Sequence, residues 1–388
     1  MTAPARTPWR PPRGLYVHVP FCEKICHYCD FNRYLLREGG VEEYLAALEG
    51  EIRLYAAGAA RDVVFDTVYI GGGTPTSLTA AQLERLLSAV FGGLRVRPGA
   101  EVTVEANPGT LTGKKLAALR SGGVNRLSLG VQSLNDELLR RLGRIHTARQ
   151  ARESYERARA WFDNVSVDLI YGLPGQDEED WRATLTEIVR WRPEHVSCYG
   201  LIIEEGTLFG ELHARGLLEL PGEERELAMY RFAIEFLGEH GYEHYEISNW
   251  ALPGRRSRHN CIYWLNGEWL GLGPGAHSQW NGLRFANVRR VDEYARLVAE
   301  GRPPLAWEEP VGEWTALEDT VILGLRLREG VDDAAFSQRF GASIAEVFPD
   351  EVRRVVELGL AEWDGRRLRL TEQGLFVSNQ VFQEFIHV

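Results

Sequence analysis

The chain is poor in sulfur. Its 388 residues include five cysteines and two methionines. Three of the cysteines, Cys22, Cys26 and Cys29, fall within one short segment, FCEKICHYCDF. An odd number of thiols cannot be used up by disulfides within the segment. Clustered cysteines in a chain of this length are more typical of metal binding or catalysis in a reducing compartment than of a disulfide framework.

Long apolar runs and excess positive charge are missing too. No apolar run approaches the ~20 residues that a membrane helix needs. Residues 1–13, rich in proline and arginine, lack the apolar core of a secretory signal and predict a disordered lead-in. Lys and Arg number 44 against 55 Asp and Glu, a net charge of −11, which argues against nucleic-acid binding. We expect a cytoplasmic protein without direct membrane insertion.

From residue 14 to about 200, short β-branched runs alternate with amphipathic helical stretches. This order predicts right-handed βαβ units and a parallel sheet, either an open barrel or an incomplete eight-stranded one. In such folds the active site lies at the carboxyl ends of the strands. The expected strands are 15–19, 66–70, 101–105, 126–130, 165–170 and 195–200.

The second half of the chain has a different pattern. We expect the barrel over 14–205 and an extension over 206–310 that mixes helix with aromatic, glycine-rich loops. Residues 311–388 predict helices followed by a hairpin at Asp364-Gly365, the order of a winged-helix-like domain. Its net charge of −6 lacks the basic surface that DNA binding needs, so we interpret it as a docking or lid domain.

The cysteine spacing, C-x3-C-x2-C, leaves two metal chemistries open. Structural zinc sites usually close with four ligands, and His18 or His27 could complete a Cys3His set. An iron–sulfur cubane uses three thiolates differently, because each binds one iron and the fourth iron stays open to another ligand.

Polar or glycine-rich signals follow nearly every expected strand. GGGTP (71–75) follows the second strand; it lacks the G-K-[ST] of a P-loop and the G-x-G-x-x-G of a dinucleotide site. Its glycines fit either an ordinary turn or close approach of a ligand. Glu105 or Asp168 alone would more often be a helix cap or an ion-pair partner. Their common place at the ends of strands favours one shared site.

The cysteine loop after the first strand of such a barrel resembles the radical S-adenosylmethionine (SAM) superfamily. Several further segments are similar to its branch of oxygen-independent coproporphyrinogen III oxidases and haem chaperones: LYVHVPFCEKICHYCDF, IGGGTP, VEANPGT, RLSLGVQS, LGRIH and VDLIYGLPGQ. The resemblance implies a partial (β/α)6 barrel with a smaller C-terminal helical, winged-helix-like domain. It also implies a [4Fe-4S] cluster on Cys22, Cys26 and Cys29 that binds SAM and reduces it to a 5′-deoxyadenosyl radical.

The same resemblance implies a set of SAM contacts on matching positions. The glycine-rich turn would receive the amino group, and the carboxylates and Arg144 suit hydroxyl, ammonium and carboxylate groups of the ligand. The set is Tyr16, Tyr28, Gly72, Gly73, Thr74, Glu105, Gln132, Arg144 and Asp168.

Three features separate the two members of the branch. The oxidases carry a further cysteine where this chain has Phe31, and the chain begins close to its first strand. The chain also contains HNCIYW (259–264), a motif of the chaperones, followed by GLGPGAHS (271–278). The resemblance implies His259 as a haem ligand, with Tyr263 and Trp264 as haem contacts. From the residues alone, a hydrogen-bonded core histidine beside two packed aromatics is the alternative.

These features predict a haem chaperone that binds a [4Fe-4S] cluster, SAM and haem. It would deliver haem to an acceptor protein such as a membrane respiratory enzyme. The alternative is a radical SAM enzyme that decarboxylates coproporphyrinogen III to protoporphyrinogen IX, so enzymatic activity stays open.

Overall fold

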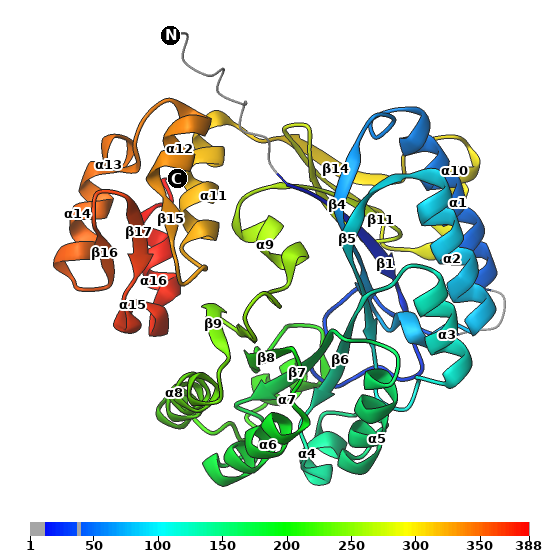
Figure 1. Ribbon diagram of the computed structural model, residues 1–388, viewed down its shortest axis with the longest axis horizontal. Coiled ribbons are helices and arrows are strands. Elements are labelled where there is room, and N and C mark those ends of the chain that lie inside the picture. Colours follow the sequence, from blue (N-terminus) through cyan, green and yellow to red (C-terminus); the bar gives the residue numbers. More distant parts are fainter. Residues whose placement is uncertain (1–11, 37–39, 388) are drawn as a thin grey trace.

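The computed structural model describes residues 12–36 and 40–387, so nearly all of the expected lead-in lies outside the described residues. Six parallel strands form the centre of a twelve-stranded sheet (Figure 1), and they are the six strands that the sequence predicts. They are β1 (Arg13–Val19), β4 (Val64–Gly72), β5 (Arg95–Ala106), β6 (Arg126–Gln132), β7 (Val165–Tyr171) and β8 (His195–Gly200).

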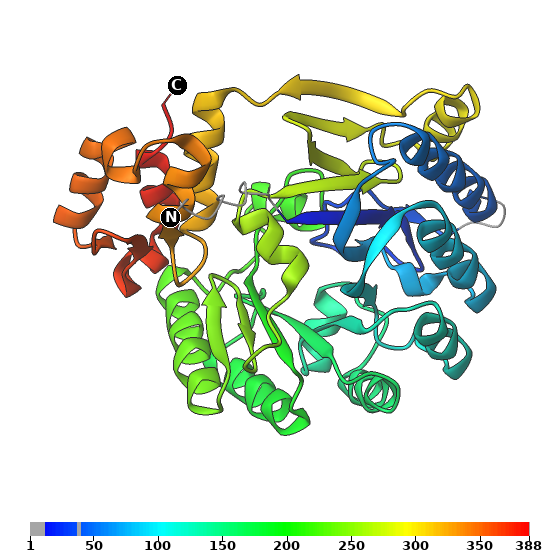
Figure 2. The same cartoon turned by 45° about the horizontal axis from the view of Figure 1, so that its top comes forward.

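Helices cover the outer face of this curved sheet (Figures 1 and 2). Side chains at several helix starts accept hydrogen bonds from otherwise unpaired backbone N–H groups, as Thr79 and Thr147 do within capping boxes. The helices are α1 (Gly40–Ala57), α2 (Ala80–Gly93), α3 (Gly113–Ser121), α4 (Asp136–Arg141), α5 (Ala148–Arg159) and α6 (Glu178–Trp191). A short 3-10 turn, η1 (Pro75–Ser77), precedes α2.

Strict alternation within the strands divides apolar from polar side chains. In β1, Leu15 and Val17 are fully buried in the core under the helices. Tyr16 and His18 lie on the other face and hydrogen-bond to each other. Successive strand residues point to opposite faces. The inner face of the curved sheet, here called the lumen, is therefore lined by polar side chains. The carboxyl ends of the six strands form its rim.

Short strands extend the sheet at both edges. The sequence predicts helix and loops for this region. Its strand segments are short and interrupted by glycine, so they become strands only by pairing with a sheet that has already formed. On one side β11 (Glu268–Leu272) runs parallel to β1, followed by β12 (His277–Trp280), β13 (Leu283–Asn287) and β14 (Leu305–Pro310). On the other lie β10 (Asn249–Ala251) and β9 (Glu243–Glu246). The helices of this region are α7 (Leu208–Ala214), α8 (Glu223–Glu239), α9 (Arg258–Trp264) and α10 (Val291–Ala299).

The C-terminal part has the expected order of helices followed by a hairpin. Its strands β15 (Val331–Asp332), β17 (Arg367–Leu370) and β16 (Ala361–Trp363) form a separate small sheet. The helices are α11 (Glu313–Gly324), α12 (Asp333–Phe340), α13 (Ile344–Val347), α14 (Pro349–Glu357), α15 (Glu372–Phe376) and α16 (Ser378–Glu384). The assignment of three domains with their boundaries stays a prediction.

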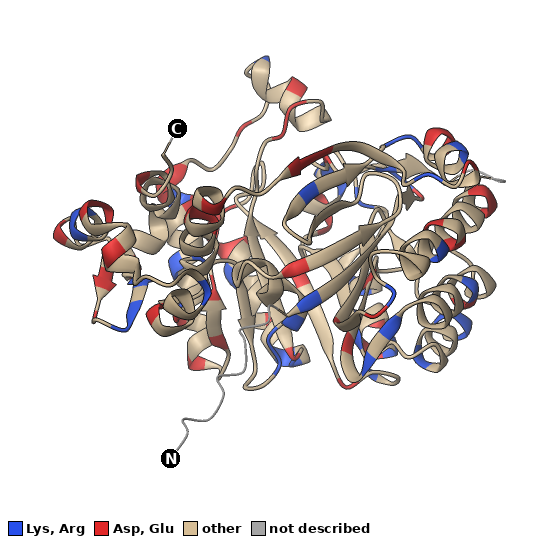
Figure 3. Cartoon of the chain, turned by 90° about the horizontal axis from the view of Figure 1, so that it is seen from above, with Lys and Arg blue, Asp and Glu red and all other residues tan. Residues whose placement is uncertain are grey.

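The distribution of charged residues and the length of the apolar helices can be compared with the expectations from composition. Figure 3 shows acidic and basic residues interspersed along the outer helices. Within residues 12–36 and 40–387, no helix is both long enough and apolar enough to cross a membrane.

Candidate functional site

The cysteine loop leaves the rim directly after β1. Two short strands, β2 (Phe21–Cys22) and β3 (Tyr34–Leu35), pair in parallel and close the base of the loop. Cys22 is buried, and Cys26 and Cys29 are partly exposed; all three are free thiols. The loop therefore holds the three cysteines of the predicted cluster on one closed segment at the rim.

Donor groups from the loop after α4 and from the turn after β4 contact two of these thiols. The guanidinium Nη1 of Arg144 lies 3.4 Å from the Sγ of Cys26, and the hydroxyl of Thr74 lies 3.5 Å from the Sγ of Cys22. Burial raises the pKa of the Cys29 thiol to about 11, so this thiol is protonated at neutral pH without a metal. Iron binding would release its proton.

A small cavity joins the cysteine loop to the rim. Cys26, Thr74, Asn107 and Arg144 are among its lining residues. Arg144 donates through Nη2 to Asn107 Oδ1 and to the carbonyl of Gly130, each at 2.7 Å, while its buried Nε has no partner. Asn107 in turn donates to the Thr74 hydroxyl at 2.9 Å. The chemistry of these groups, thiols beside a fixed guanidinium, fits an iron–sulfur cluster next to a carboxylate-bearing ligand.

The zinc alternative finds less support in the geometry. Among the described residues, no three His, Cys, Asp or Glu side chains are placed to hold one metal ion. A cubane does not require such convergence, because each thiolate binds a different iron. Of the two histidines considered for a Cys3His set, His18 already bonds the Tyr16 hydroxyl and the carbonyl of Asn32 through its two ring nitrogens.

The GGGTP turn lies against the cysteine loop. The amides of Gly73 and Thr74 donate to the carbonyls of Val19 and Phe21, both at 2.8 Å. Gly72 has a φ of +109°, and a Cβ there would lie 2.5 Å from the His18 ring. Only glycine fits that backbone position without strain. The turn therefore needs its glycine for packing within the rim as well as for any ligand.

Glu105 and Asp168 lie on the lumen side, Glu105 near the end of β5 and Asp168 in the middle of β7, further from the strand end than the sequence predicts. Glu105 accepts from the Tyr69 hydroxyl at 2.7 Å and from the Gly72 amide at 3.1 Å. Burial raises its pKa to about 7. Asp168 accepts from Ser128 and Ser197 at 2.8 Å, and burial raises its pKa as well. Both carboxylates are held in fixed orientation by neighbouring strands.

Gln132 and Tyr28 also border the rim. Gln132 ends β6 with a φ of 67°, and its amide nitrogen lies close to Gly130. Tyr28 packs with an apolar cluster that includes Leu142 and Phe209. Burial raises the pKa of Tyr28, and the positive charge of the Arg144 guanidinium near its hydroxyl acts against this larger effect. The fold thus brings the cysteines and seven of the nine predicted SAM residues to one end of the lumen, whereas Tyr16 and Asp168 lie halfway along β1 and β7 and face the lumen.

HNCIYW occupies the opposite end. It forms helix α9, which Figure 1 shows inside the concave side of the sheet. Backbone amides of Arg258 and His259 donate to Glu101, at the middle of β5 where it pairs with Thr67 of β4, at 3.1 and 3.0 Å. A Cβ on Gly14, at the start of β1, would lie 2.9 Å from the His259 ring. The helix therefore packs across the amino ends of the strands.

His259 is fully buried and both of its ring nitrogens are hydrogen-bonded. Nδ1 pairs with the Thr67 hydroxyl at 2.7 Å and Nε2 with the Tyr263 hydroxyl at 2.8 Å. Burial lowers its pKa to about 3, so the ring is neutral. Trp264 instead lies under the guanidinium of Arg326, 4.3 Å from its ring centroid. In this conformation His259 offers no free nitrogen to an iron.

The segment GLGPGAHS (271–278) packs against β1 and the cysteine loop. The buried Glu51 of α1 accepts from the Gly273 amide at 2.8 Å and from the Asn287 side chain at 2.6 Å. Gly273 has a φ of +96°, and a Cβ there would lie 2.5 Å from the carbonyl of His18. Asn32, at the end of the cysteine loop, donates to the Pro274 carbonyl at 2.9 Å. The motif therefore holds β1 and the cysteine loop in place.

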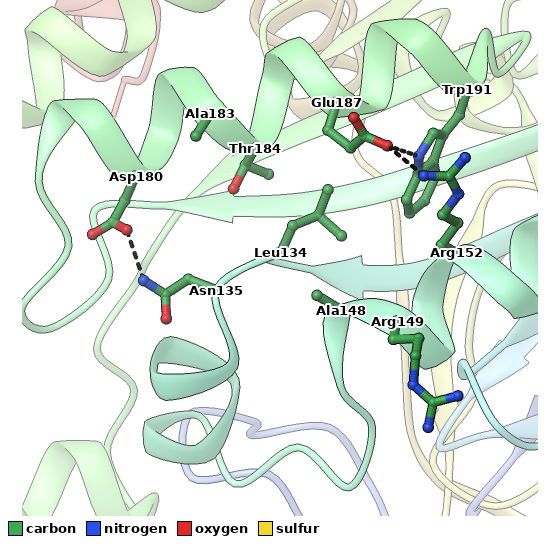
Figure 4. Close-up of a pocket in the computed structure, with 10 residues that line it drawn as sticks. All are labelled: Leu134, Asn135, Ala148, Arg149, Arg152, Asp180, Ala183, Thr184, Glu187 and Trp191. Atoms are coloured by element: carbon green, nitrogen blue, oxygen red, sulfur yellow. Dashed lines mark hydrogen bonds and ion pairs between the residues drawn. The ribbon is translucent and has the colours of Figure 1, made fainter.

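A second hollow lies on the outside of the barrel between α5 and α6 (Figure 4). Its volume is about 620 Å³. Its polar side chains are largely paired with each other: Asn135 with Asp180 at 2.7 Å, and Arg152 with Glu187 at 3.3 Å. It contains no cysteine or histidine, so the rim is the stronger candidate site.

Sequence reasoning did not single out Asn107 or Tyr69, which the site uses, and it named His18 only as a possible zinc ligand. Asn107 joins Thr74 to Arg144, and it follows a strand end just as Glu105 does, so the same positional rule would have found it. Tyr69 and His18 are inward residues of predicted strands. Their roles depend on contacts across strands that no local pattern contains.

Comparisons with known proteins identify the family of this chain. The family model of the radical SAM superfamily matches residues 16–188, and the model of the HemN C-terminal domain matches residues 312–377. The haem chaperone HemW of Bacillus subtilis is 40% identical over 377 residues, covering 96% of this chain and 99% of the relative. The chain therefore belongs to the radical SAM superfamily, in the branch that contains HemN and HemW.

Two further relatives show the extent of the likeness. HemW of Lactococcus lactis is 38% identical and covers 97% of both chains. The solved structure of the coproporphyrinogen III oxidase HemN from Escherichia coli, described as a radical SAM enzyme, is 27% identical with a TM-score of 0.85. It matches 98% of this chain and 91% of the oxidase. The predicted fold class and family are thereby confirmed.

Proposed function

We propose that this protein is a haem chaperone of the radical SAM superfamily. It binds a [4Fe-4S] cluster, SAM and haem, and it passes haem to an acceptor protein such as a membrane respiratory enzyme. The observation that carries the proposal is the end-to-end identity of 40% with a relative named as a haem chaperone. Phe31 at the position of the oxidases' additional cysteine and the HNCIYW helix support the same choice.

At the rim, Cys22, Cys26 and Cys29 would hold the cluster. When bound, the cluster supplies an iron open to a further ligand and an electron for it. The chain's own groups would orient SAM: the GGGTP turn its amino group, Arg144 its carboxylate, and Asp168 its ribose hydroxyls. Arg144 is already fixed by Asn107 and Gly130, so little reorganisation is needed when a carboxylate arrives.

Haem binding by His259 has a structural condition. A ring nitrogen becomes available only if the hydrogen bond to Thr67 or to Tyr263 breaks. Because the ring has no exposed surface, α9 must also shift to admit a porphyrin. We therefore propose that haem is taken up in a conformation in which α9 has moved from the lumen, with Tyr263 and Trp264 as candidate ring contacts.

The first experiment is a haem titration of anaerobically reconstituted protein, followed in the Soret band. We expect saturation near one haem per chain. His259→Ala should weaken binding while leaving the brown cluster absorbance intact. His195→Ala is a matched control, because that lumen histidine is also fully buried with both ring nitrogens bonded. Absence of saturable binding in the unaltered protein would refute the chaperone function.

The cluster assignment has its own test. Replacing Cys22, Cys26 or Cys29 with Ala should abolish the cluster absorbance and the bound iron, whereas Cys261→Ala should not. Cys261 lies in the HNCIYW helix, at the opposite end of the lumen from the rim. A triple variant that still holds a full complement of iron after reconstitution would disprove the assignment.

The alternative is the decarboxylation of coproporphyrinogen III. Likeness to the HemN structure at a TM-score of 0.85, together with the intact set of rim residues, favours keeping it. The test supplies coproporphyrinogen III, SAM and a reductant to the reconstituted protein and looks for decarboxylated porphyrinogen. Turnover without haem binding would establish the enzyme; haem binding without turnover would establish the chaperone.

A further inference from the structure

We propose that Tyr69 is a positioning residue that couples helix α9 to the carboxylate of Glu105. By this coupling, haem bound at α9 and SAM bound at the rim weaken each other's binding. The inference rests on the proposed function, because it takes haem and SAM as the two ligands. Tyr69 stands between the two ends of the lumen and contacts a group from each.

On the rim side, Tyr69 fixes one oxygen of Glu105. Its hydroxyl donates to Oε1 at 2.7 Å, while the Gly72 amide donates to Oε2 at 3.1 Å. With both oxygens held, the carboxylate keeps one orientation next to the GGGTP turn. Without the Tyr69 hydroxyl only the Gly72 amide would remain, and the carboxylate could rotate.

On the other side, the ring of Tyr69 packs against His259. The two ring centroids are 5.2 Å apart with an interplanar angle of 29°. His259 also bonds the hydroxyl of Thr67, two residues before Tyr69 on the same strand. The HNCIYW histidine is thereby attached to β4 twice, through a hydrogen bond and through a stacked ring.

Haem ligation would disturb this contact. Both ring nitrogens of His259 are used, so coordination to iron must break the bond to Thr67 or to Tyr263 and displace the ring from Tyr69. Tyr69 then loses a packing partner and holds Glu105 less firmly. By thermodynamic linkage, SAM must weaken haem binding by the same factor.

A titration signature distinguishes positioning from general loosening of the fold. Burial raises the pKa of Glu105 to about 7, and the hydrogen bond from Tyr69 lowers it. Removing that hydroxyl therefore raises the pKa of Glu105 further. If SAM binding needs the ionised carboxylate, SAM affinity should begin to fall at a higher pH in Tyr69→Phe than in the unaltered protein as the pH is lowered. The titratable groups that act on Glu105 or are acted on by it are Tyr16, Tyr69, Arg126, Asp168 and Tyr263.

The experiment measures SAM affinity of the reconstituted full chain, with and without saturating haem and across pH 6 to 9. It compares the unaltered protein with Tyr69→Phe, His259→Phe and the double variant. Tyr155→Phe is the matched control, because that hydroxyl bonds the Trp191 carbonyl on the outer layer. We expect Tyr69→Phe to weaken SAM binding about tenfold, the order expected for one hydrogen bond to a charged group.

The coupling predicts non-additivity. Haem should weaken SAM binding several-fold in the unaltered protein and much less in Tyr69→Phe. Without haem, His259→Phe should affect SAM affinity less when Tyr69 is already replaced. Additive effects, or a Tyr69→Phe protein with unaltered SAM affinity and pH midpoint, would overturn the inference alone. If the unaltered protein fails to bind SAM or fails to bind haem, both the proposed function and this inference are refuted.

Discussion

Glu51 offers a sharp test of the packing behind the rim. It is fully buried in α1 and accepts hydrogen bonds from Gly273, Asn287 and Tyr294. Burial nevertheless raises its pKa to about 7. Glu51→Gln removes the ionisation and keeps the shape, so the comparison isolates the effect of charging this one carboxyl group.

The sign follows from proton linkage. Folded Glu51 keeps its proton to a higher pH than the unfolded chain does, so its contribution to stability is full below about pH 4.5 and is lost as pH rises through about 7. A pKa of about 7 in place of 4.5 corresponds to about 3 kcal/mol. Relative to Glu51→Gln, the unaltered protein should therefore lose about 2.5 kcal/mol of unfolding free energy between pH 5 and pH 8, because part of the contribution is already lost at pH 5.

Thermal unfolding of the cluster-free protein at pH 5, 6, 7 and 8 measures this loss. At about 2 °C per kcal/mol for a large chain, the difference in Tm between the two proteins should change by roughly 5 °C. Glu49→Gln on the same helix is the control. The pKa of Glu49 is lowered by its hydrogen bond from Arg85, so that variant should show no such change above pH 5. Parallel Tm curves for Glu51→Gln and the unaltered protein would refute the reasoning.

Three other substitutions test the rim and the lumen. Gly72→Ala places a Cβ 2.5 Å from the His18 ring at a φ of +109°, so SAM binding should be lost and Tm should fall, unlike in Gly92→Ala, where nothing lies within 4 Å. Arg144→Lys keeps the charge but loses the planar fork, so SAM affinity should fall about tenfold with unchanged iron content, measured by equilibrium binding and iron assay. Arg126→Met removes a buried cation that lowers the pKa of the buried carboxyl groups of Glu105 and Asp168 against the larger effect of burial, so Tm should fall, and a Tm that stays unchanged or rises would contradict this.

The parallel core could be predicted because its signals are local. In VSVDLI, three apolar side chains alternate with Ser166 and Asp168, and the structure buries the first set under helices while Asp168 faces the lumen. Period two alternation with polar residues inward is visible in each predicted strand. The positions of Glu105 and Gln132 at strand ends then follow from parallel topology alone, whereas Asp168 lies in the middle of β7.

The added strands and the packing of α9 could not be predicted in the same way. β11 pairs with β1, more than 250 residues earlier in the sequence, and its five residues carry no signal that specifies this neighbour. The burial of His259 depends on Thr67, 192 residues away. The motif HNCIYW shows which side chains are present. It does not show that both ring nitrogens of His259 are already hydrogen-bonded, one to Thr67 of the sheet and one to Tyr263 of the same helix.

The placement of HNCIYW changes how the motif should be understood. A metal-binding histidine is usually expected near an opening. His259 is instead fully buried inside the lumen, with a neutral ring and two short hydrogen bonds. Those bonds stabilise the closed lumen, and the same two bonds oppose haem ligation. Under the proposed function, haem release would be favoured by such competition, because the hydrogen bonds would re-form as the iron leaves. The core histidine and the haem ligand, between which the sequence left the choice open, would then be two states of one residue.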